Sequence, residues 1–246
     1  MKDFDTYRRR FVTSVLGIAA TTTLPVGVMF WQTAQGKEVE DSPASSKIRW
    51  GMLVDTTKCA TGCNACVSAC NKENGISGEV TDTSPQWIRK VKVTNPENGY
   101  SFTLPMMCQH CEEPPCTDVC PTGASFKRAD GIVLVDRHIC IGCRYCMMAC
   151  PYKARSFIHQ PVEDQLAEVP RGQGCVESCT FCVQRIDAGQ QTTACQDACN
   201  AEGHQAIFFG DLKDPESSIS KQLATYGAKE VLPDLNLHTG VRYQGI

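Results

Sequence analysis

The chain has 246 residues, with 24 Lys or Arg against 27 Asp or Glu, so its formal net charge at pH 7 is −3. This balance argues against a generally basic surface that binds nucleic-acid phosphates, because such binding depends on clustered Lys and Arg. Hydrophobic residues make up 42% of the chain, and 17 residues are cysteines. The apolar core is therefore modest for a body of one or two domains.

The first segment, residues 1–34, predicts an export signal. Tyr7-Arg8-Arg9-Arg10-Phe11-Val12 opens a stretch without charged residues that continues to Gly36, which is typical of a twin-arginine signal. Phe11 to Trp31 would be about 31 Å long as a helix and would just span a bilayer, so the segment is either removed or retained as a membrane anchor. Residues 35–46 read as a linker. The expected location is the periplasm or the extracytoplasmic face of the cytoplasmic membrane.

Three short β elements are predicted in the body that follows. Trp50–Asp55 is an apolar strand, and Trp87–Leu104 alternates apolar and polar residues around the turn-rich Asn95–Gly99, which predicts a β-hairpin. Gly131–Asp136 is a second apolar strand. Both apolar strands lead directly into cysteine-rich stretches.

Two segments are expected to lie on the surface. Residues 153–174 form a polar loop that contains proline and is more consistent with a docking surface than with a core element. The tail, residues 210–246, is polar, carries Asp214-Pro215 and Leu232-Pro233, and is expected to form a surface strap. The predicted body therefore spans residues 47–209.

Sixteen cysteines form four runs that each end in Cys-x3-Cys. The runs are Cys59/Cys63/Cys66/Cys70, Cys108/Cys111/Cys116/Cys120, Cys140/Cys143/Cys146/Cys150 and Cys179/Cys182/Cys195/Cys199. The third run matches the bacterial ferredoxin pattern C-x2-C-x2-C-x3-C-P in full. Four runs of four thiolates are enough for four cubane iron-sulfur clusters. Loss of the metal is then expected to loosen the fold.

The spacing predicts that runs share their clusters in pairs. Small Gly142 leaves room for the backbone to approach inorganic sulfur. If Cys146 to Cys150 is a helical turn, the last sulfur is carried about 6 Å along the axis, towards a neighbouring cluster. In two-cluster ferredoxins the fourth cysteine binds the other cluster, and the following proline ends the helix.

Crossed pairing gives four predicted ligand sets. They are Cys59, Cys63, Cys66 and Cys199 for cluster 1, Cys179, Cys182, Cys195 and Cys70 for cluster 2, Cys108, Cys111, Cys116 and Cys150 for cluster 3, and Cys140, Cys143, Cys146 and Cys120 for cluster 4. The inner lobe is then about 105–155, and the outer lobe is about 47–80 plus 175–205. The outer runs have stretched spacings, and Asn71 and Asn200 replace the proline. Cys175 is either an inert buried thiol or a substitute for one of the outer ligands.

Other uses of cysteine, histidine and basic residues predict different patterns or roles. Zinc ribbons, disulfide scaffolds and covalent c-type haem do not predict four crowded runs, and no C-x2-C-H occurs. His110 is expected to have an ordinary polar role, or to hydrogen-bond a cluster sulfur and tune its potential. Arg144, Lys153 and Arg155 are either solvated or pair with acidic groups of a partner. No catalytic residue is expected, because every cluster has four cysteines and no iron is left open.

The body also resembles a known family. Met107–Ala124, Arg144–Arg155 and Cys179–Asp187 look like the four-cluster ferredoxin subunits that accompany molybdopterin oxidoreductases and membrane quinone-interacting subunits, and Gly210–Ser218 resembles their shared tail. The resemblance covers residues 47–246. It implies an α+β fold of two intertwined dicluster-ferredoxin-like lobes with a β-hairpin insert, holding four 4Fe-4S clusters.

The family also implies a function and partners. The lead-in Gly51–Lys58 and the ending Gly240–Ile246 look most like periplasmic iron-sulfur subunits of membrane complexes linked to dissimilatory sulfur metabolism. Such a subunit relays electrons between a multihaem cytochrome c and a quinone-interacting integral membrane subunit, together with further redox subunits. The alternative is the small subunit of a periplasmic molybdopterin reductase that acts on tetrathionate, nitrite or a similar acceptor.

Overall fold

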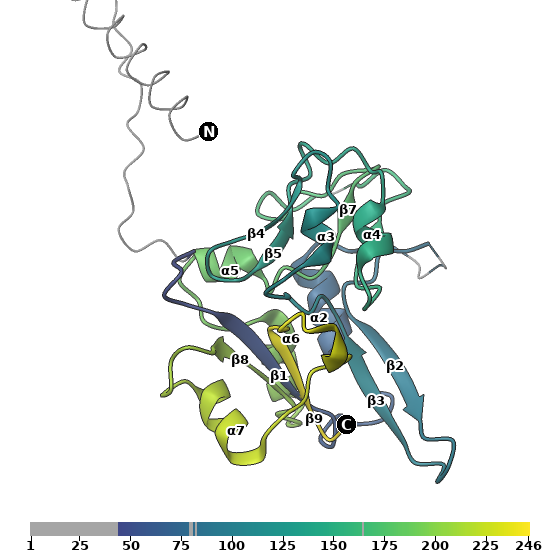
Figure 1. The fold of residues 1–246 in the computed structure, drawn as a ribbon. Helices are drawn as coiled ribbons and strands as arrows, with labels where there is room; N and C mark the ends of the chain where they lie inside the picture. The colour runs from purple at the N-terminus through teal and green to yellow at the C-terminus, as the bar shows by residue number, and fades with distance from the viewer. Residues whose placement is uncertain (1–43, 79–80, 82, 164) are drawn as a thin grey trace, which may run out of the picture. The chain divides into compact units, whose positions relative to one another are not determined.

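The computed structural model of the protein describes residues 44–78, 81, 83–163 and 165–246 (Figure 1). The predicted export signal and nearly all of the predicted linker lie outside these residues. Within the described part of the chain, none of the helices is long and apolar enough to cross a membrane.

A three-stranded sheet joins segments from both ends of the body. Its order is β8 (Ile207–Asp211), β1 (Trp50–Asp55) and β9 (Val241–Gln244), with β8 antiparallel and β9 parallel to β1 (Figure 1). Every residue of β1 is buried, as its apolar run predicts for a central strand. Trp50 of β1 stacks on Phe209 of β8, with ring centroids 5.2 Å apart. The predicted first strand is confirmed.

The C-terminal segment differs from the predicted surface strap. The expected boundary at residue 210 falls inside β8, and α7 (Ser218–Tyr226) packs against β8. The η2 turn (Pro233–Leu235) then leads towards β9, whose Val241 and Tyr243 point into the core. The Tyr243 hydroxyl donates to the Pro105 carbonyl at 3.0 Å and accepts from Gln109 Nε2 at 3.1 Å. The last strand is therefore part of the core.

We expect Tyr243→Phe to destabilise the protein by about 1–2 kcal/mol, because the Pro105 carbonyl would lose its buried donor and the Gln109 amide would keep only its hydrogen bond to the Met107 carbonyl. The temperature at which the purified protein unfolds should fall accordingly. An unchanged unfolding temperature would contradict a structural role for this hydroxyl. Tyr226→Phe, at an exposed position of α7, is the matched control.

The helices that follow the cysteine loops differ in length for a reason visible in the sequence. In the inner runs, α3 (Pro115–Asp118) and α4 (Tyr145–Ala149) stop before Cys120-Pro121 and Cys150-Pro151. In the outer runs, α2 (Ala65–Glu73) and α6 (Ala194–Ala201) continue past the last cysteine. Proline cannot donate the backbone hydrogen bond that a helix needs, whereas Asn71 and Asn200 can. Helices α2 and α6 pack on each other, as do α3 and α4.

The remaining strands form short antiparallel pairs. The predicted hairpin is confirmed as β2 (Arg89–Thr94) paired with β3 (Ser101–Met106), and it extends away from the sheet (Figure 1). β4 (Ser125–Lys127) pairs with β5 (Val133–Val135), which lies within the predicted strand. β6 (Ser156–Phe157) pairs with β7 (Val176–Glu177), and the short helix α5 (Val183–Asp187) follows Cys182.

The segment 153–174 is anchored at its end by a buried ion pair. The Arg171 guanidinium forms two hydrogen bonds to the Glu177 carboxylate, of 3.0 Å and 2.7 Å, and a third of 2.8 Å to the carbonyl of Gly75. Both side chains of the pair are buried. Arg171 therefore connects this segment to residues just after the first cysteine run and just before the fourth. This end of the segment has a structural role.

Candidate metal centres

The four cysteine loops share one backbone conformation. The residue before the second cysteine of each run has a positive φ: Gly62 at 83°, His110 at 43°, Gly142 at 67° and Phe181 at 55°. Histidine and phenylalanine rarely adopt this left-handed conformation. Its recurrence indicates that the four loops make a similar turn before the second cysteine, although their spacings differ in sequence.

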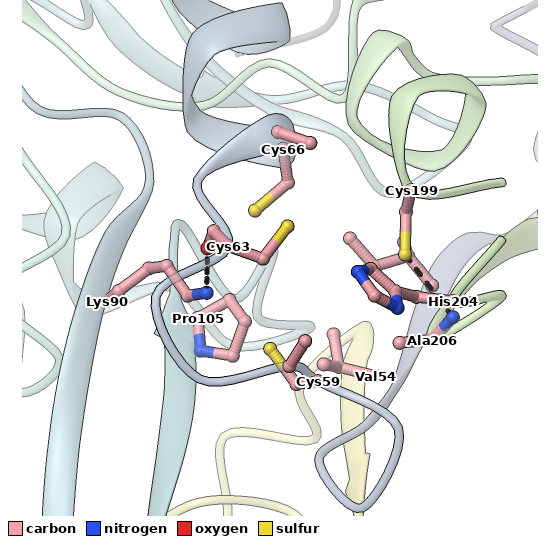
Figure 2. A pocket seen from close by; sticks show the side chains of 12 residues that line it. Val54, Cys59, Cys63, Cys66, Lys90, Pro105, Cys199, His204 and Ala206 are labelled. Atoms are coloured by element: carbon pink, nitrogen blue, oxygen red, sulfur yellow. Dashed lines mark hydrogen bonds between the residues drawn. The ribbon is translucent and has the colours of Figure 1, made fainter. Parts of the chain in front are cut away.

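The first predicted ligand set lines a single pocket. Figure 2 shows the sulfur atoms of Cys59, Cys63 and Cys66 facing the same space as that of Cys199, which arrives from α6. The pocket wall is otherwise mostly apolar, with Val54, Ala65, Pro105 and Ile207 among its residues. Cysteines from the first and last runs thus converge, although they are far apart in the sequence.

The other three sets are brought together in the same crossed way. Cys179 interacts electrostatically with Cys70, Cys195 and Cys182. Cys111 interacts in this way with Cys108, Cys116 and Cys150. Cys146 does so with Cys120 and Cys140, and Cys143 follows Gly142 in the same loop. The fourth cysteine of each run therefore lies near cysteines of another run, in agreement with the predicted crossed sets.

Burial keeps most of these thiols protonated until a metal displaces the proton. It raises the pKa of Cys66 to about 11 and the pKa values of Cys108, Cys111 and Cys195 to about 12. Burial disfavours the thiolate, whereas a bound metal deprotonates a coordinating thiol outright. Cluster assembly is therefore accompanied by proton release.

The final cysteine of every run receives an N–H donor at sulfur. The side-chain amide of Asn74 lies 3.5 Å from Cys70 Sγ, and backbone amides of Ser125, Ala154 and Ala206 donate to Cys120 at 3.4 Å, Cys150 at 3.5 Å and Cys199 at 3.3 Å. At Cys120 burial acts to raise the pKa, but hydrogen bonds from Ser125, Thr122 and Ala124 lower it overall. Such donors stabilise a sulfur that carries negative charge.

The number and grouping of the cysteines suit iron-sulfur clusters. Among the residues that the structure describes, no group of three or more Cys, His, Asp or Glu side chains is arranged to hold one metal ion. Four thiolates around zinc, each about 2.3 Å from the metal, would lie only about 3.8 Å apart. A cubane is larger because each thiolate binds its own iron atom. Groups of thiols from two runs, with N–H donors at sulfur, are a suitable donor set for a cluster.

The space beside Gly142 is taken by protein backbone. A Cβ at this position would lie 2.2 Å from the carbonyl oxygen of Gly174 and 3.1 Å from the Phe157 ring. The predicted approach of the backbone to inorganic sulfur stays a prediction, and the neighbour that the structure shows at this glycine is the Gly174 carbonyl. The positive φ of Gly142 adds a second reason for glycine.

We expect Gly142→Ala to cost about 1–3 kcal/mol and to disturb the loop that carries Cys143, because both the conformation and the contact oppose a side chain. Gly123 also has a positive φ, but a Cβ there would have nothing within 4 Å. Gly123→Ala therefore shows the effect of the backbone conformation without the close contact. Iron content after mild heating is the measurement. Equal iron loss in the two variants would show that the Gly174 contact is unimportant.

His110 and Cys175 have structural surroundings. His110 is fully buried, accepts a hydrogen bond from the Val133 amide at Nδ1, and stacks on Phe181 with ring centroids 3.7 Å apart. Because His110 follows Cys108 and Phe181 follows Cys179, the stack joins the second cysteine loop to the fourth. Cys175 is buried beside Cys140 and donates to the Arg137 carbonyl. It therefore lies next to an inner ligand, not in place of an outer one.

Arg155 overturns the expectation for the cations near the third run. Arg144 and Lys153 are exposed, and Arg144 lies over the Phe157 ring. Arg155 is only 5% exposed and is hydrogen-bonded to the Cys116 thiol. It is neither a solvated side chain nor free to pair with a docking partner. The sequence signal for a position near the ligands is that Arg155 follows Cys150-Pro151 closely, because a short turn after the proline returns the chain to the cysteines.

Four cysteine loops with a common turn, and thiols that lie near thiols of other runs, are typical of a ferredoxin-type iron-sulfur protein. Comparisons agree: a 4Fe-4S dicluster domain family matches residues 100–211, and a second family of the same description matches residues 58–124. The chain is 46% identical over 204 residues to the Hdr-like menaquinol oxidoreductase iron-sulfur subunit 1 of Archaeoglobus fulgidus, covering 72% of this chain and 76% of that protein.

Two further relatives match over most of their length. A tetrathionate reductase subunit of Salmonella typhimurium is 34% identical over 250 residues, covering 99% of this chain and 90% of that protein. Protein NrfC of Escherichia coli K12 is 34% identical over 236 residues, covering 92% and 90%. The chain belongs to this family of iron-sulfur electron-transfer subunits of oxidoreductase complexes, and its two dicluster domains carry four 4Fe-4S clusters.

Proposed function

We propose that this chain is a non-catalytic relay that passes single electrons through its four clusters, in the order 1, 2, 3, 4, between two partners of a membrane-bound respiratory complex. The crossed sets named above supply the ligands. The partners are a quinone-interacting integral membrane subunit and a multihaem cytochrome c subunit. The chain acts at the extracytoplasmic face of the membrane after export by the twin-arginine route.

The pattern of cysteine burial is the observation that carries this order. All cysteines of sets 2 and 3 are buried. Set 1 contains the partly exposed Cys59 and Cys63, and set 4 contains the exposed Cys143. Clusters 1 and 4 are thus accessible to partners, while clusters 2 and 3 are internal.

Contacts between the sets support the same order. Cys195 of set 2 interacts electrostatically with Cys66 of set 1, and Cys116 of set 3 interacts with Cys146 of set 4. The stack of His110 on Phe181 joins the loops of sets 2 and 3. Each neighbouring pair in the proposed order is therefore linked by an electrostatic interaction or a ring contact, which suits a linear path for electrons.

The finer assignment is to the DsrO type of subunit, from a membrane complex of dissimilatory sulfur metabolism. The similarity to a menaquinol oxidoreductase subunit supports a quinone-linked partner. The resemblance of the first cysteine run and the C-terminal ending to DsrO supports the sulfur link. The second candidate is the electron-transfer subunit of a molybdopterin reductase, which the similarity to the tetrathionate reductase subunit favours.

The test is to purify the tagged full-length chain anaerobically from solubilised membranes and to identify the subunits that remain bound. The proposal predicts a quinone-interacting membrane subunit and a haem-bearing subunit, and it predicts that added quinol reduces the chain's clusters. A molybdopterin subunit in their place would transfer the function to the second candidate. Recovery of the chain alone, with clusters that quinol does not reduce, would contradict both.

A further inference from the structure

A buried cation lies between the two inner cysteine sets. Arg155 Nη2 donates to the Sγ of Cys116, a proposed ligand of cluster 3, at 3.1 Å, and to the Ser125 hydroxyl at 2.7 Å. The same guanidinium interacts with Cys146, a proposed ligand of cluster 4. One side chain therefore contacts ligands of two clusters.

The charge of Arg155 has no carboxylate partner among the described residues. The ionisable groups that it faces are the thiols of Cys116, Cys108 and Cys146, which are neutral until they bind metal. Its Nε and Nη1 are buried and have no hydrogen-bond acceptor within the described protein. An uncompensated buried cation costs several kcal/mol, so its counter-charge must come from the groups that it faces. Cluster sulfurs and ligand thiolates are acceptors of the required charge.

We propose that Arg155 sets the reduction potentials of clusters 3 and 4, holding both higher by donating hydrogen bonds to their sulfur atoms. The proposal rests on the ligand sets of the proposed function. A cluster accepts one electron from its reductant and gains one negative charge, and no covalent bond forms or breaks. A fixed positive charge nearby stabilises the reduced form more than the oxidised form, and hydrogen bonds to sulfur act in the same direction.

The geometry also explains why one residue acts on two clusters. The Ser125 hydroxyl accepts a hydrogen bond from the guanidinium and fixes it on one side. After α4, residues 151–154 return the chain towards α3, and both helices lie next to proposed ligands. Because the side chain is buried, solvent screens its charge little. Arg155 thus acts through the ligands that it contacts: it makes the internal cluster 3 and the accessible cluster 4 easier to reduce.

The experiment is an EPR-monitored redox titration of the full-length protein in its complex, for the wild type, Arg155→Met and Arg155→Lys. For Arg155→Met the equilibrium constant for reduction should fall at least tenfold at two clusters, which is about 59 mV for a one-electron couple, with the other two unchanged. Arg155→Lys keeps the charge and should recover much of the shift. Lys153→Met, an exposed cation two residues away, is the matched control and should leave all four potentials unchanged.

Four intact clusters with unaltered potentials in Arg155→Met would overturn the proposal, and so would an equal shift in Lys153→Met. If Arg155→Met fails to assemble its clusters, Ser125→Ala decides, because it only releases the guanidinium from its anchor. A lowered potential in Ser125→Ala supports the proposal, and an unchanged one refutes it. A wild-type chain with fewer than four clusters would instead refute the proposed function, before any variant is compared.

Discussion

Removing two cysteines at a time is expected to show whether each cluster is bound by cysteines of two runs, which is crossed binding, or by the four cysteines of one run, which is sequential binding. Cys150→Ala and Cys116→Ala both remove ligands of cluster 3 if pairing is crossed, so the double variant should lose the same single cluster as either single variant. Cys150→Ala with Cys143→Ala should lose two clusters, because these residues of one run then belong to different sets. Loss of a ligand leaves the cluster incomplete and labile.

The measurement is the number of intact 4Fe-4S clusters per chain, from Mössbauer spectra and EPR spin counts of anaerobic protein. Crossed pairing predicts three clusters in the Cys150/Cys116 double variant and two in the Cys150/Cys143 double variant. Sequential pairing predicts the reverse. Cys175→Ala is the control for loss of a buried cysteine and should keep all four clusters, because no set requires it.

Removing the Glu177 carboxylate is expected to have the largest effect on stability. Glu177→Ala leaves the Arg171 guanidinium buried without its counter-charge, in side chains that are 6% and 0% exposed in the native pair. Breaking a buried pair in this way costs about 3–5 kcal/mol. The temperature at which heating abolishes the visible iron-sulfur absorbance should fall clearly, and the loss should begin near the first and last runs that Arg171 connects.

Two variants make this result specific. Arg171→Met with Glu177→Leu removes both charges and should recover much of the loss, because replacing a buried ion pair by apolar side chains is often close to neutral. Glu216→Ala breaks an exposed pair with Lys221, whose side chains are 82% and 59% exposed, and should change the temperature little. Equal shifts in Glu177→Ala and Glu216→Ala would show that the buried pair is not a major source of stability.

Local patterns in the sequence predicted the elements that depend on neighbouring residues. The buried strand Trp50–Asp55 and the hairpin around Asn95–Gly99 follow from hydrophobic runs and turn residues. The short inner helices follow from the prolines after Cys120 and Cys150. The crossed arrangement of the cysteines also follows from the sequence, because a helical turn carries the fourth thiol away from the first three. It stays a prediction.

The remaining features depend on contacts between distant segments. The four residues of β9 are too few for alternation to identify a strand, and its parallel pairing with β1 joins opposite ends of the body. Arg155 was predicted either to be solvated or to pair with acidic groups of a partner, and arginine is almost never fully buried unless paired. Its burial becomes apparent only when Cys116 and Ser125 are seen beside it. In the same way, only the fold reveals the contact of His110 with Phe181.

The central claim, four 4Fe-4S clusters working as one relay, is tested most directly by anaerobic iron and acid-labile sulfide analysis combined with a reductive EPR titration. Four clusters of four irons predict about sixteen iron and sixteen sulfide per chain. Contacts between neighbouring sets predict EPR signals that broaden and split as adjacent clusters become reduced together. Zinc in place of iron, or four clusters whose signals show no mutual interaction, would contradict the account.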